Sequence, residues 1–395
     1  MERNRLKNMD VALRLFLDAV APTDRTERIP LEDADNRVLC KDITAPLDYP
    51  HYDQCILDGY AVRAEDTVGC GARNAKAMLP VKKGRVREGL CMSVHTGSAM
   101  PPGADALVPL EDVTEKDGRV LVLKEVKKRE WVWSRGEGIA AGGVVLREGM
   151  QLKPTDIAML AKVGMTHVDV YDKPRVLIIP TGDECVRRDA SLGPGFVYEV
   201  NGLMCCLLVK RYGGNPTLHD IVPDDRGRLA DALTGCREHD LVVTIGGSSA
   251  GKRDLMGRVV SSIGQVMYHG VAFHPGNHMG AGLIGVAEEV RPVAFLPGYT
   301  ESCAVSAFMF VDPAIRKIGH YPPSQYGREP VQLTGDMSTP VGIRAVRKVN
   351  VRDGRARQVK LIAESADPGR YAYIVVPEET SLIESGQTAE AVYLE

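Results

Sequence analysis

The chain has 395 residues, enough for roughly two to four domains at about 100–200 residues each. Its 49 basic and 52 acidic residues give a formal net charge of −3, which argues against nucleic-acid or membrane-surface binding as the main role. Hydrophobic residues make up 44% and charged residues 26% of the sequence, as in globular proteins. Fibrous and disordered classes are therefore excluded.

The nine cysteines are odd in number and include no C-x-x-C pair. Neither a thiolate zinc site nor a disulfide framework is indicated, so free thiols in a reducing compartment are expected. The first ten residues contain no apolar signal region, and no stretch approaches the about 18 apolar residues of a membrane span. We therefore expect a cytoplasmic protein.

The first 170 residues predict a helix, then many short strands, then a second helix. Apolar residues at helical spacing between Val11 and Val20 predict an amphipathic helix with Asp10 as its N-cap, ended by Pro22. Residues 37–130 read as short strands separated by Gly and Pro, which is typical of a small β-rich domain. A second helix is expected to start near Pro154.

From Lys173 onward strands alternate with helices, which predicts βαβ units and a mostly parallel sheet. The expected strands are 176–179, 218–222, 241–245 and 293–296, and the expected helices are 201–213, capped by Asn201, 227–233 and 300–311. After residue 322 a β pattern returns, with strands expected at 358–362 and 373–376. This tail is expected to form a separate small β domain.

The turn at 246–253, between an expected strand and an expected helix, admits three functional interpretations. It matches the phosphate-loop pattern G-x-x-x-x-G-K, but Arg253 stands where Ser or Thr would hold Mg²⁺. It also contains G-x-S-x-G centred on Ser249, as in a nucleophile elbow. The third interpretation is an anion cradle of backbone N–H groups and hydroxyls at a helix N-terminus. We favour the cradle, and a turn that only packs helix on sheet stays open.

Carboxylates form a second set of candidates, because several follow strand ends. They are Asp58, Asp183, Glu184, Asp224, Asp225 and Asp254. Each alone also fits a helix cap or a solvated turn, but together they provide the oxygen ligands of a Mg²⁺ site beside a phosphate. His269, His274 and His278 form a third set, and Pro275-Gly276 breaks any helix that would align them on a metal. A loop that binds an anion or faces water is the better interpretation.

An ordered set of motifs along nearly the whole chain resembles the molybdopterin molybdenumtransferases, a family that includes the gephyrin E domain. These motifs are residues 47–50, 57–62, 96–97, 102–108, 135–137, 181–184, 246–248, 275–276 and 296–298, with Asp53, Tyr198 and Asn201. No single motif is specific, but their order and spacing together are.

The resemblance implies a homodimer whose subunit has four parts. Residues 1–45 with 140–173 would form an elongated helical and β segment, 46–139 an inserted β-rich domain, 174–321 the α/β/α molybdopterin-binding domain, and 322–395 a C-terminal β-barrel. The implied reaction takes adenylylated molybdopterin and molybdate as substrates, releases AMP with the help of Mg²⁺, and leaves molybdenum on the dithiolene.

The resemblance also implies roles for individual residues. Asp58, Thr96 and Glu184 would be catalytic, and Asp224 and Asp254 would hold the metal. The residues expected to bind the cofactor are Gly246, Gly247, Ser248, Ser249, His274, Pro275, Gly276, Pro297 and Gly298.

The sequence departs from the family pattern at several positions. Gly138 stands where the family has Asp, an Arg is expected near Trp133, and 274–278 and 297–300 replace Pro-Gly-Lys-Pro and Pro-Gly-Asn-Pro. A histidine, with an ordinary pKa of about 6.5, is a weaker partner than lysine for the molybdate dianion.

Two hypotheses follow from these departures. In the first, the chain is a working insertase in which histidines and nearby Arg or Lys residues replace the lost lysines. In the second, it is a non-catalytic or repurposed relative that binds molybdopterin or a nucleotide as a carrier. We favour the first, and rank an unrelated serine hydrolase third.

Overall fold

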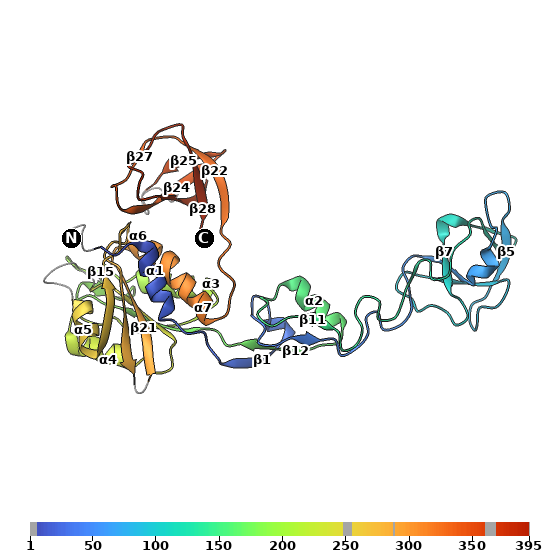
Figure 1. Ribbon diagram of the computed structural model, residues 1–395, viewed down its shortest axis with the longest axis horizontal. Coiled ribbons are helices and arrows are strands. Elements are labelled where there is room, and N and C mark those ends of the chain that lie inside the picture. The colour runs from blue at the N-terminus through green and yellow to red at the C-terminus, as the bar shows by residue number, and fades with distance from the viewer. Residues whose placement is uncertain (1–5, 248–254, 287–288, 360–368, 395) are drawn as a thin grey trace. The chain divides into compact units, whose positions relative to one another are not determined.

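A computed structural model describes residues 6–247, 255–286, 289–359 and 369–394, which form two compact units (Figure 1). The main unit combines Met1–Glu27 with Tyr171–Glu395, and the inserted unit is Arg28–Val170. Among the described residues, none of the helices has the length and apolar character needed to cross a membrane. The finer division into four parts stays a prediction.

A six-stranded sheet in the order β16-β13-β17-β21-β20-β18 is the centre of the main unit. Its strands are β13 (Arg175–Pro180), β16 (Asn215–Leu218), β17 (Leu241–Ile245), β18 (Gly264–His269), β20 (Gly280–Val286) and β21 (Glu289–Leu296). The pairs among β16, β13, β17 and β21 are parallel, whereas β20 and β18 continue the sheet antiparallel. The sheet is thus mixed, with its parallel half formed by the expected strands.

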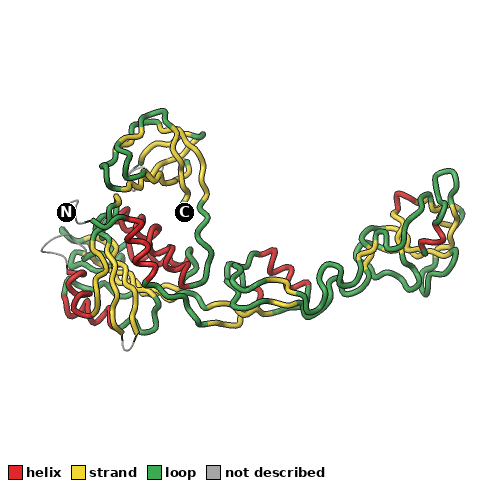
Figure 2. Tube along the Cα trace, in the orientation of Figure 1, coloured by secondary structure: helices red, strands yellow, loops and turns green. Residues whose placement is uncertain are grey.

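Helices cover both faces of this sheet (Figure 2). They are α1 (Met9–Asp18), α3 (Asn201–Arg211), α4 (Arg226–Thr234), α5 (Leu255–Ile263), α6 (Thr300–Ser306) and α7 (Asp312–Ile318), with a π-helical turn at Ala307–Val311. Residues Val176 and Ile178 of β13 point to the face packed by α1, α3, α6 and α7, and Leu177 and Ile179 point to the face packed by α4 and α5. This alternation along a strand buried on both sides confirms the α/β/α architecture.

Several expected boundaries were wrong. The N-cap of α1 is Asn8, whose side chain accepts from two backbone N–H groups, and Asp10 lies in the first turn. The strand expected at 218–222 is Asn215–Leu218; it contains Pro216, which is tolerated because β16 is an edge strand. The helix expected to end at Val311 continues through the π-helical turn into α7.

The C-terminal part of the main unit is a small β-barrel. Strands β24, β25, β22, β28 and β26 pair in a closed ring, because β26 also pairs with β24. The strands here are β22 (Gly327–Leu333), β23 (Met337–Ser338), β24 (Arg344–Arg352), β25 (Arg355–Gln358), β26 (Arg370–Val376), β27 (Leu382–Ile383) and β28 (Thr388–Tyr393). The expected barrel is confirmed, and most of the strand expected at 358–362 falls outside the described residues.

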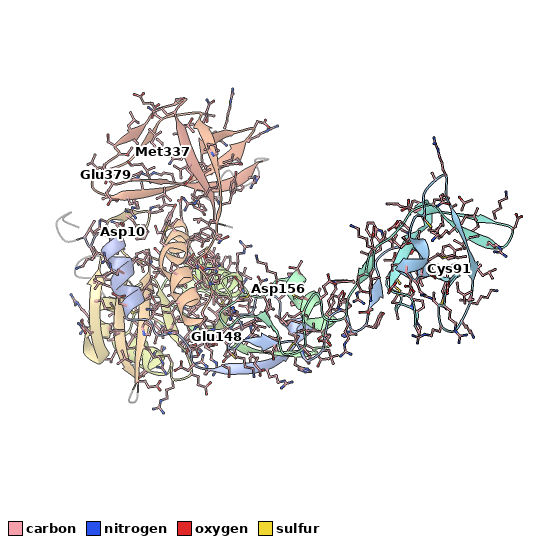
Figure 3. The ribbon with its side chains drawn as sticks, turned by 45° about the vertical axis from the view of Figure 1, so that its right-hand side comes forward. Asp10, Cys91, Glu148, Asp156, Met337 and Glu379 are labelled. Carbon is pink, nitrogen blue, oxygen red and sulfur yellow. The ribbon has the colours of Figure 1, made fainter. Side chains whose placement is uncertain are left out.

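The barrel contacts the rest of the main unit through backbone pairing and through ion pairs. Strand β19 (Phe273–His274) pairs in parallel with the start of β24. Arg344 of β24 forms a bidentate ion pair with Asp10, which lies at the start of α1 (Figure 3), and also pairs with Glu378. The barrel therefore reaches the loop that contains His274.

The described residues of the inserted unit form three hydrophobic clusters. One surrounds Leu39, Leu152 and Leu160, and the other two pack on a six-stranded sheet in the order β7-β4-β6-β5-β9-β8. Its helix is α2 (Pro154–Lys162). The strands, including β1 and β12 at its ends, are β1 (Thr26–Pro30), β2 (Ile43–Thr44), β3 (Gln54–Cys55), β4 (Gly59–Val62), β5 (Lys76–Pro80), β6 (Leu90–Val94), β7 (Ala106–Pro109), β8 (Val113–Lys116), β9 (Arg119–Val122), β10 (Val132–Trp133), β11 (Val144–Leu146) and β12 (His167–Tyr171). The expected β-rich region is present.

Candidate functional site

Four loops meet at one edge of the main sheet because β13, β16, β17 and β21 are parallel. They are residues 181–184, 219–225, 246–247 and 297–298. In an open α/β sheet, ligands bind beyond the carboxyl ends of the strands. Most of the described residues that were predicted for the site in the main unit therefore lie on one edge.

Backbone hydrogen bonds hold these loops together. The N–H of Thr181 donates to Ile245 O at 2.8 Å, Gly182 N–H donates to Val222 O at 3.2 Å, and Gly246 N–H donates to Leu296 O at 3.0 Å. These bonds continue the parallel pairing beyond the ends of the strands. The loops are thus fixed by the sheet itself.

Close packing at this edge requires glycine at position 246. The φ angle of Gly246 is +92°, and a Cβ there would lie 2.7 Å from the carbonyl oxygen of Thr181. A Cβ on Gly298 would lie 3.6 Å from the Cα of Gly246, so these two loops lie side by side. Two of the loops predicted to bind the cofactor are therefore neighbours.

Three carboxylates gather beside these glycines. The N–H of Asp224 donates to Asp183 Oδ1 at 3.0 Å. Partial burial, and then the negative charges of Asp183 and Glu184, raise the pKa of Asp224 above its ordinary value. We call Asp183, Glu184 and Asp224 the acid cluster; its members lie close enough to repel one another.

Asn201 has a different role from the predicted one. It is the first residue of α3, where Glu199 provides the cap by accepting from Gly202 N–H at 2.6 Å. The Asn201 amide instead donates to Gly298 O at 2.7 Å, and its own Oδ1 is buried with no hydrogen-bond partner among the described residues. Asn201 therefore ties α3 to the 297–298 loop.

A cation from the barrel reaches the predicted histidine loop. Arg347 Nη1 lies 2.7 Å from His274 Nδ1, and Arg347 Nη2 donates to Ser338 O at 3.3 Å. Burial, and then the charge of Arg347, lower the pKa of His274, so the imidazole is neutral at pH 7 and accepts from the guanidinium. His274 is thus an acceptor in this structure.

The same cation faces the first turn of α6. Burial raises the pKa of Glu301, and the positive charges of Lys348 and Arg347 oppose that rise. Because α6 follows the 297–298 loop directly, Arg347 and Lys348 lie near one end of the predicted site. The sequence analysis did not predict Arg347 or Lys348, because the long-range pairing of β19 with β24, and not a local motif, brings them to the site.

The rest of the histidine loop is fixed by packing. The peptide bond between His274 and Pro275 is cis, and a Cβ on Gly276 would collide with the ring of Phe273. Burial lowers the pKa of His278, whose Nδ1 has no hydrogen-bond partner among the described residues. The loop thus places a half-buried imidazole near its glycine.

Asp58 and Thr96 come together in the inserted unit. The backbone N–H and the hydroxyl of Thr96 donate to Asp58 Oδ1 at 2.7 and 2.9 Å. These bonds, with a smaller contribution from His95, lower the pKa of Asp58, so this exposed carboxylate is ionised at neutral pH. The structure thus brings Asp58 and Thr96 into contact, and their catalytic role stays a prediction.

Three predicted residues, Ser248, Ser249 and Asp254, lie outside the described residues. Within the described part of the chain, no group of three or more His, Cys, Asp or Glu side chains is arranged as a metal site. The acid cluster is therefore a set of neighbouring carboxylates, and the structure does not show a complete metal cage.

Comparison with known proteins agrees with this architecture. Residues 7–164 match the family described as MoeA N-terminal region (domain I and II), and residues 177–317 match the probable molybdopterin binding domain. The fold is similar to that of a molybdopterin biosynthesis MoeA protein from Pyrococcus horikosii, with a TM-score of 0.82 at 26% identity over 99% of this chain and 100% of that chain.

Relatives of similar length share about a third of the sequence. A putative molybdopterin biosynthesis protein of Methanocaldococcus jannaschii is 34% identical over 73% of both chains. Molybdopterin molybdenumtransferase 2 of Mycobacterium tuberculosis is 31% identical over 81% of this chain and 82% of its own length. The chain therefore belongs to the molybdopterin molybdenumtransferase family, enzymes of molybdenum cofactor biosynthesis.

Proposed function

We propose that the chain inserts molybdenum from molybdate into adenylylated molybdopterin and releases AMP. The observation that carries this proposal is the acid cluster, Asp183, Glu184 and Asp224, at the carboxyl edge of the parallel strands. Partial burial, and then the negative charges of Asp183 and Glu184, raise the pKa of Asp224, so a bound cation would offset both effects. A site of this kind favours a bound cation.

The acid cluster fits Mg²⁺, which prefers carboxylate oxygens and keeps several waters. Asp224 would hold the ion, together with Asp254, and Glu184 lies in the same cluster. When bound, Mg²⁺ neutralises charge on the phosphoanhydride that is broken when AMP leaves. The backbone N–H of Gly247 would orient the phosphate beside it, whereas the N–H of Gly246 is already donated to Leu296 O.

Molybdate, a dianion, needs positive charge at the other end of the site. The lysines of the family pattern are absent from 274–278, and Arg347 with Lys348 would take their place. A guanidinium presents several N–H donors in one plane, which suits an oxyanion. His274 holds Arg347 in position by accepting one of its hydrogen bonds. This arrangement supports a working insertase over a carrier.

Asp58 and Thr96 remain the proposed catalytic residues of the inserted unit. The two Thr96 donors keep Asp58 ionised, so it can act as a base or as an anchor for a cationic group. The homodimer is also a proposal, and sedimentation equilibrium of the purified chain tests it.

The decisive assay measures AMP release from adenylylated molybdopterin with Mg²⁺, with and without molybdate, followed by reconstitution of an apo-molybdoenzyme. Asp58→Ala and Asp254→Ala are expected to abolish turnover. Arg347→Gln is expected to raise the molybdate concentration for half-maximal rate by at least about tenfold, the effect of losing one charged hydrogen bond. Arg352→Gln is the matched control, since Arg352 lies at the end of the same strand with a side chain 67% exposed.

Each outcome has a clear meaning. Molybdate-dependent AMP release that yields active cofactor establishes the insertase. Tight binding of the adenylylated substrate without turnover would instead make the chain a carrier. Wild-type AMP release from the Asp58 and Asp254 variants would remove these acids from the reaction.

A further inference from the structure

Glu301 is a half-buried carboxylate at the end of the site that the barrel cations reach, and it was not among the predicted site residues. It is the second residue of α6, three residues after Gly298. The positive charges of Lys348 and Arg347, both on strand β24, act on Glu301, and the charge of Glu301 acts in turn on Arg347. One carboxylate and two cations therefore lie in the same neighbourhood.

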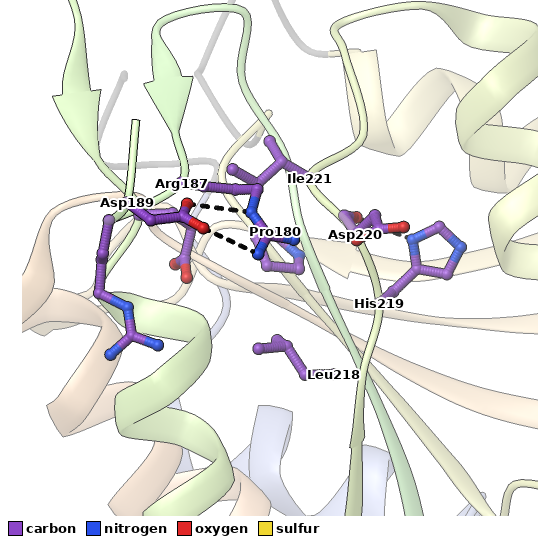
Figure 4. Close-up of a pocket in the computed structure, with 9 residues that line it drawn as sticks. Pro180, Arg187, Asp189, Leu218, His219, Asp220 and Ile221 are labelled. Atoms are coloured by element: carbon purple, nitrogen blue, oxygen red, sulfur yellow. Dashed lines mark hydrogen bonds and ion pairs between the residues drawn. The ribbon is translucent and has the colours of Figure 1, made fainter. Parts of the chain in front are cut away.

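No hydrogen bond or ion pair joins the Glu301 carboxylate to another residue in the described part of the chain. Figure 4 shows the contrasting case in the wall of a cavity. There Arg187 and Asp189, just after β14 (Cys185–Val186), share two hydrogen bonds of 3.2 Å. Glu301 and Arg347 interact through their charges without forming such a pair. The Glu301 carboxyl group is thus open to a bound group.

The two cations are held by uncharged groups. Arg347 Nη1 lies 2.7 Å from His274 Nδ1, and Arg347 Nη2 donates to Ser338 O at 3.3 Å. A guanidinium has five N–H donors, so these two bonds do not saturate it, and its buried Nε has no hydrogen-bond partner among the described residues. The Lys348 ammonium lies 4.6 Å from the centre of the Tyr371 ring. Both cations therefore keep charge and donors for an anion.

We propose that Glu301 binds molybdate together with Arg347, and that its carboxyl group carries a proton when the oxyanion is bound. Molybdate at neutral pH is a dianion whose four oxygens only accept hydrogen bonds. An ionised carboxylate beside it would repel it, whereas a protonated carboxyl group donates to it. One proton therefore passes from water to Glu301, and no covalent bond of the oxyanion breaks. The inference rests on the proposed function, because it describes how the same site receives molybdate.

The surroundings of Glu301 make the protonated form accessible. Burial raises its pKa, although the charges of Lys348 and then Arg347 oppose that rise, and a bound dianion would raise it further. His274 of β19 is neutral at pH 7. The elements packed on α6 bring Glu199, which caps α3, and, at their far ends, Lys210 and Arg211 of α3 and Glu289 and Arg291 of β21. Molybdate binding should therefore weaken as the pH rises, by up to about tenfold per pH unit.

Titration calorimetry of the full chain with sodium molybdate tests this inference. Titrations at pH 6.5 and pH 8, each in two buffers of different ionisation enthalpy, give the affinity and the number of protons taken up. Glu301→Gln provides an N–H donor that needs no proton, and Glu301→Ala removes both the charge and the donor. Glu379→Gln is the matched control, because Glu379 is an exposed glutamate of the barrel (Figure 3).

We expect the wild type to take up more than half a proton per molybdate at pH 6.5 and to bind at least about fivefold more weakly at pH 8. Glu301→Gln should take up no proton, bind equally at both pH values, and bind more tightly than the wild type at pH 8. Glu301→Ala should also take up no proton but bind at least about fivefold more weakly than Glu301→Gln, because it lacks the donor. Glu379→Gln should behave as the wild type does.

Absence of proton uptake by the wild type, or no molybdate binding at millimolar concentration, would overturn the inference whatever the variants do. Proton uptake that persists in Glu301→Gln would assign the proton to another group and overturn it too. Equal binding by Glu301→Gln and Glu301→Ala would exclude the direct contact. The proposed function is tested separately: proton-linked molybdate binding without AMP release keeps this inference and loses the insertase, and molybdate-dependent AMP release without proton uptake does the reverse.

Discussion

Replacing Asn201 by alanine and by aspartate tests whether its amide holds the 297–298 loop. In the wild type the amide donates to Gly298 O at 2.7 Å, and the residue is only 8% exposed. Alanine removes this bond but also removes an amide oxygen that has no partner among the described residues. We therefore expect Asn201→Ala to cost about 1 kcal/mol of unfolding free energy.

Aspartate has nearly the same shape but turns a second oxygen toward Gly298 O. The buried, ionised carboxylate then faces a carbonyl, which should cost roughly 2–4 kcal/mol at pH 8. Since one kcal/mol shifts the Tm of a domain of 150–250 residues by about 2–4 °C, Asn201→Ala should lose about 2–4 °C and Asn201→Asp roughly 5–15 °C.

The stability of the Asn201→Asp variant should also depend on pH. Burial raises its pKa above the unfolded value, so its stability is greatest at low pH and is lost as the pH rises through the folded pKa. In scanning calorimetry, the loss of Tm relative to the wild type should be smaller at pH 5 than at pH 8, because at pH 5 the protonated carboxyl donates to Gly298 O. Asn215→Asp, at an exposed position, is the control. If Asn201→Asp lost no Tm, or lost the same Tm at both pH values, the hydrogen bond from Asn201 to Gly298 O would be refuted.

Three further predictions concern the other loops of the site. Gly246→Ala, at φ +92° with a Cβ 2.7 Å from Thr181 O, should destabilise the main unit by at least about 1–2 kcal/mol in a thermal scan; an unchanged Tm would contradict this geometry. Asp224→Asn should unfold no earlier than the wild type at pH 7, because the raised pKa means that its ionised form costs stability there, while titration calorimetry should show weakened Mg²⁺ binding. Thr96→Val removes one of the two donors that lower the Asp58 pKa, so the acid limb of the pH–rate profile should move to higher pH. An unmoved acid limb would mean that the titration of Asp58 does not cause it.

The fold could be predicted from the sequence wherever a segment carries its own pattern. The buried strands β13 and β17 are short apolar runs next to glycine turns, and they appear where expected. The expected strand at 218–222 was displaced because its position depends on pairing with β13, a contact far away in the sequence. The helix expected to end at Val311 continues because the π-helical turn keeps the chain helical into α7.

The loops of the candidate site could be predicted from the sequence, but the positive charge from the barrel could not. Gly246, Gly298, Glu184 and Asp224 each follow a strand, so their common edge follows from parallel pairing. Arg347 could not be found this way, because it lies on a barrel strand 73 residues beyond His274. Its place depends on a tertiary contact that no local pattern encodes.

The interrupted path of the chain through the main unit constrains the order in which the protein folds on the ribosome. Helix α1 packs against α7, which is made only after the whole inserted unit and the whole main sheet. The inserted unit, Arg28–Val170, is continuous in sequence and has its own hydrophobic clusters, so it can fold as soon as it emerges. The apolar residues of α1, among them Phe16, therefore wait for β18, for the π-helical turn and last for α7, and a nascent chain stopped before Asp312 leaves α1 without the α7 contact.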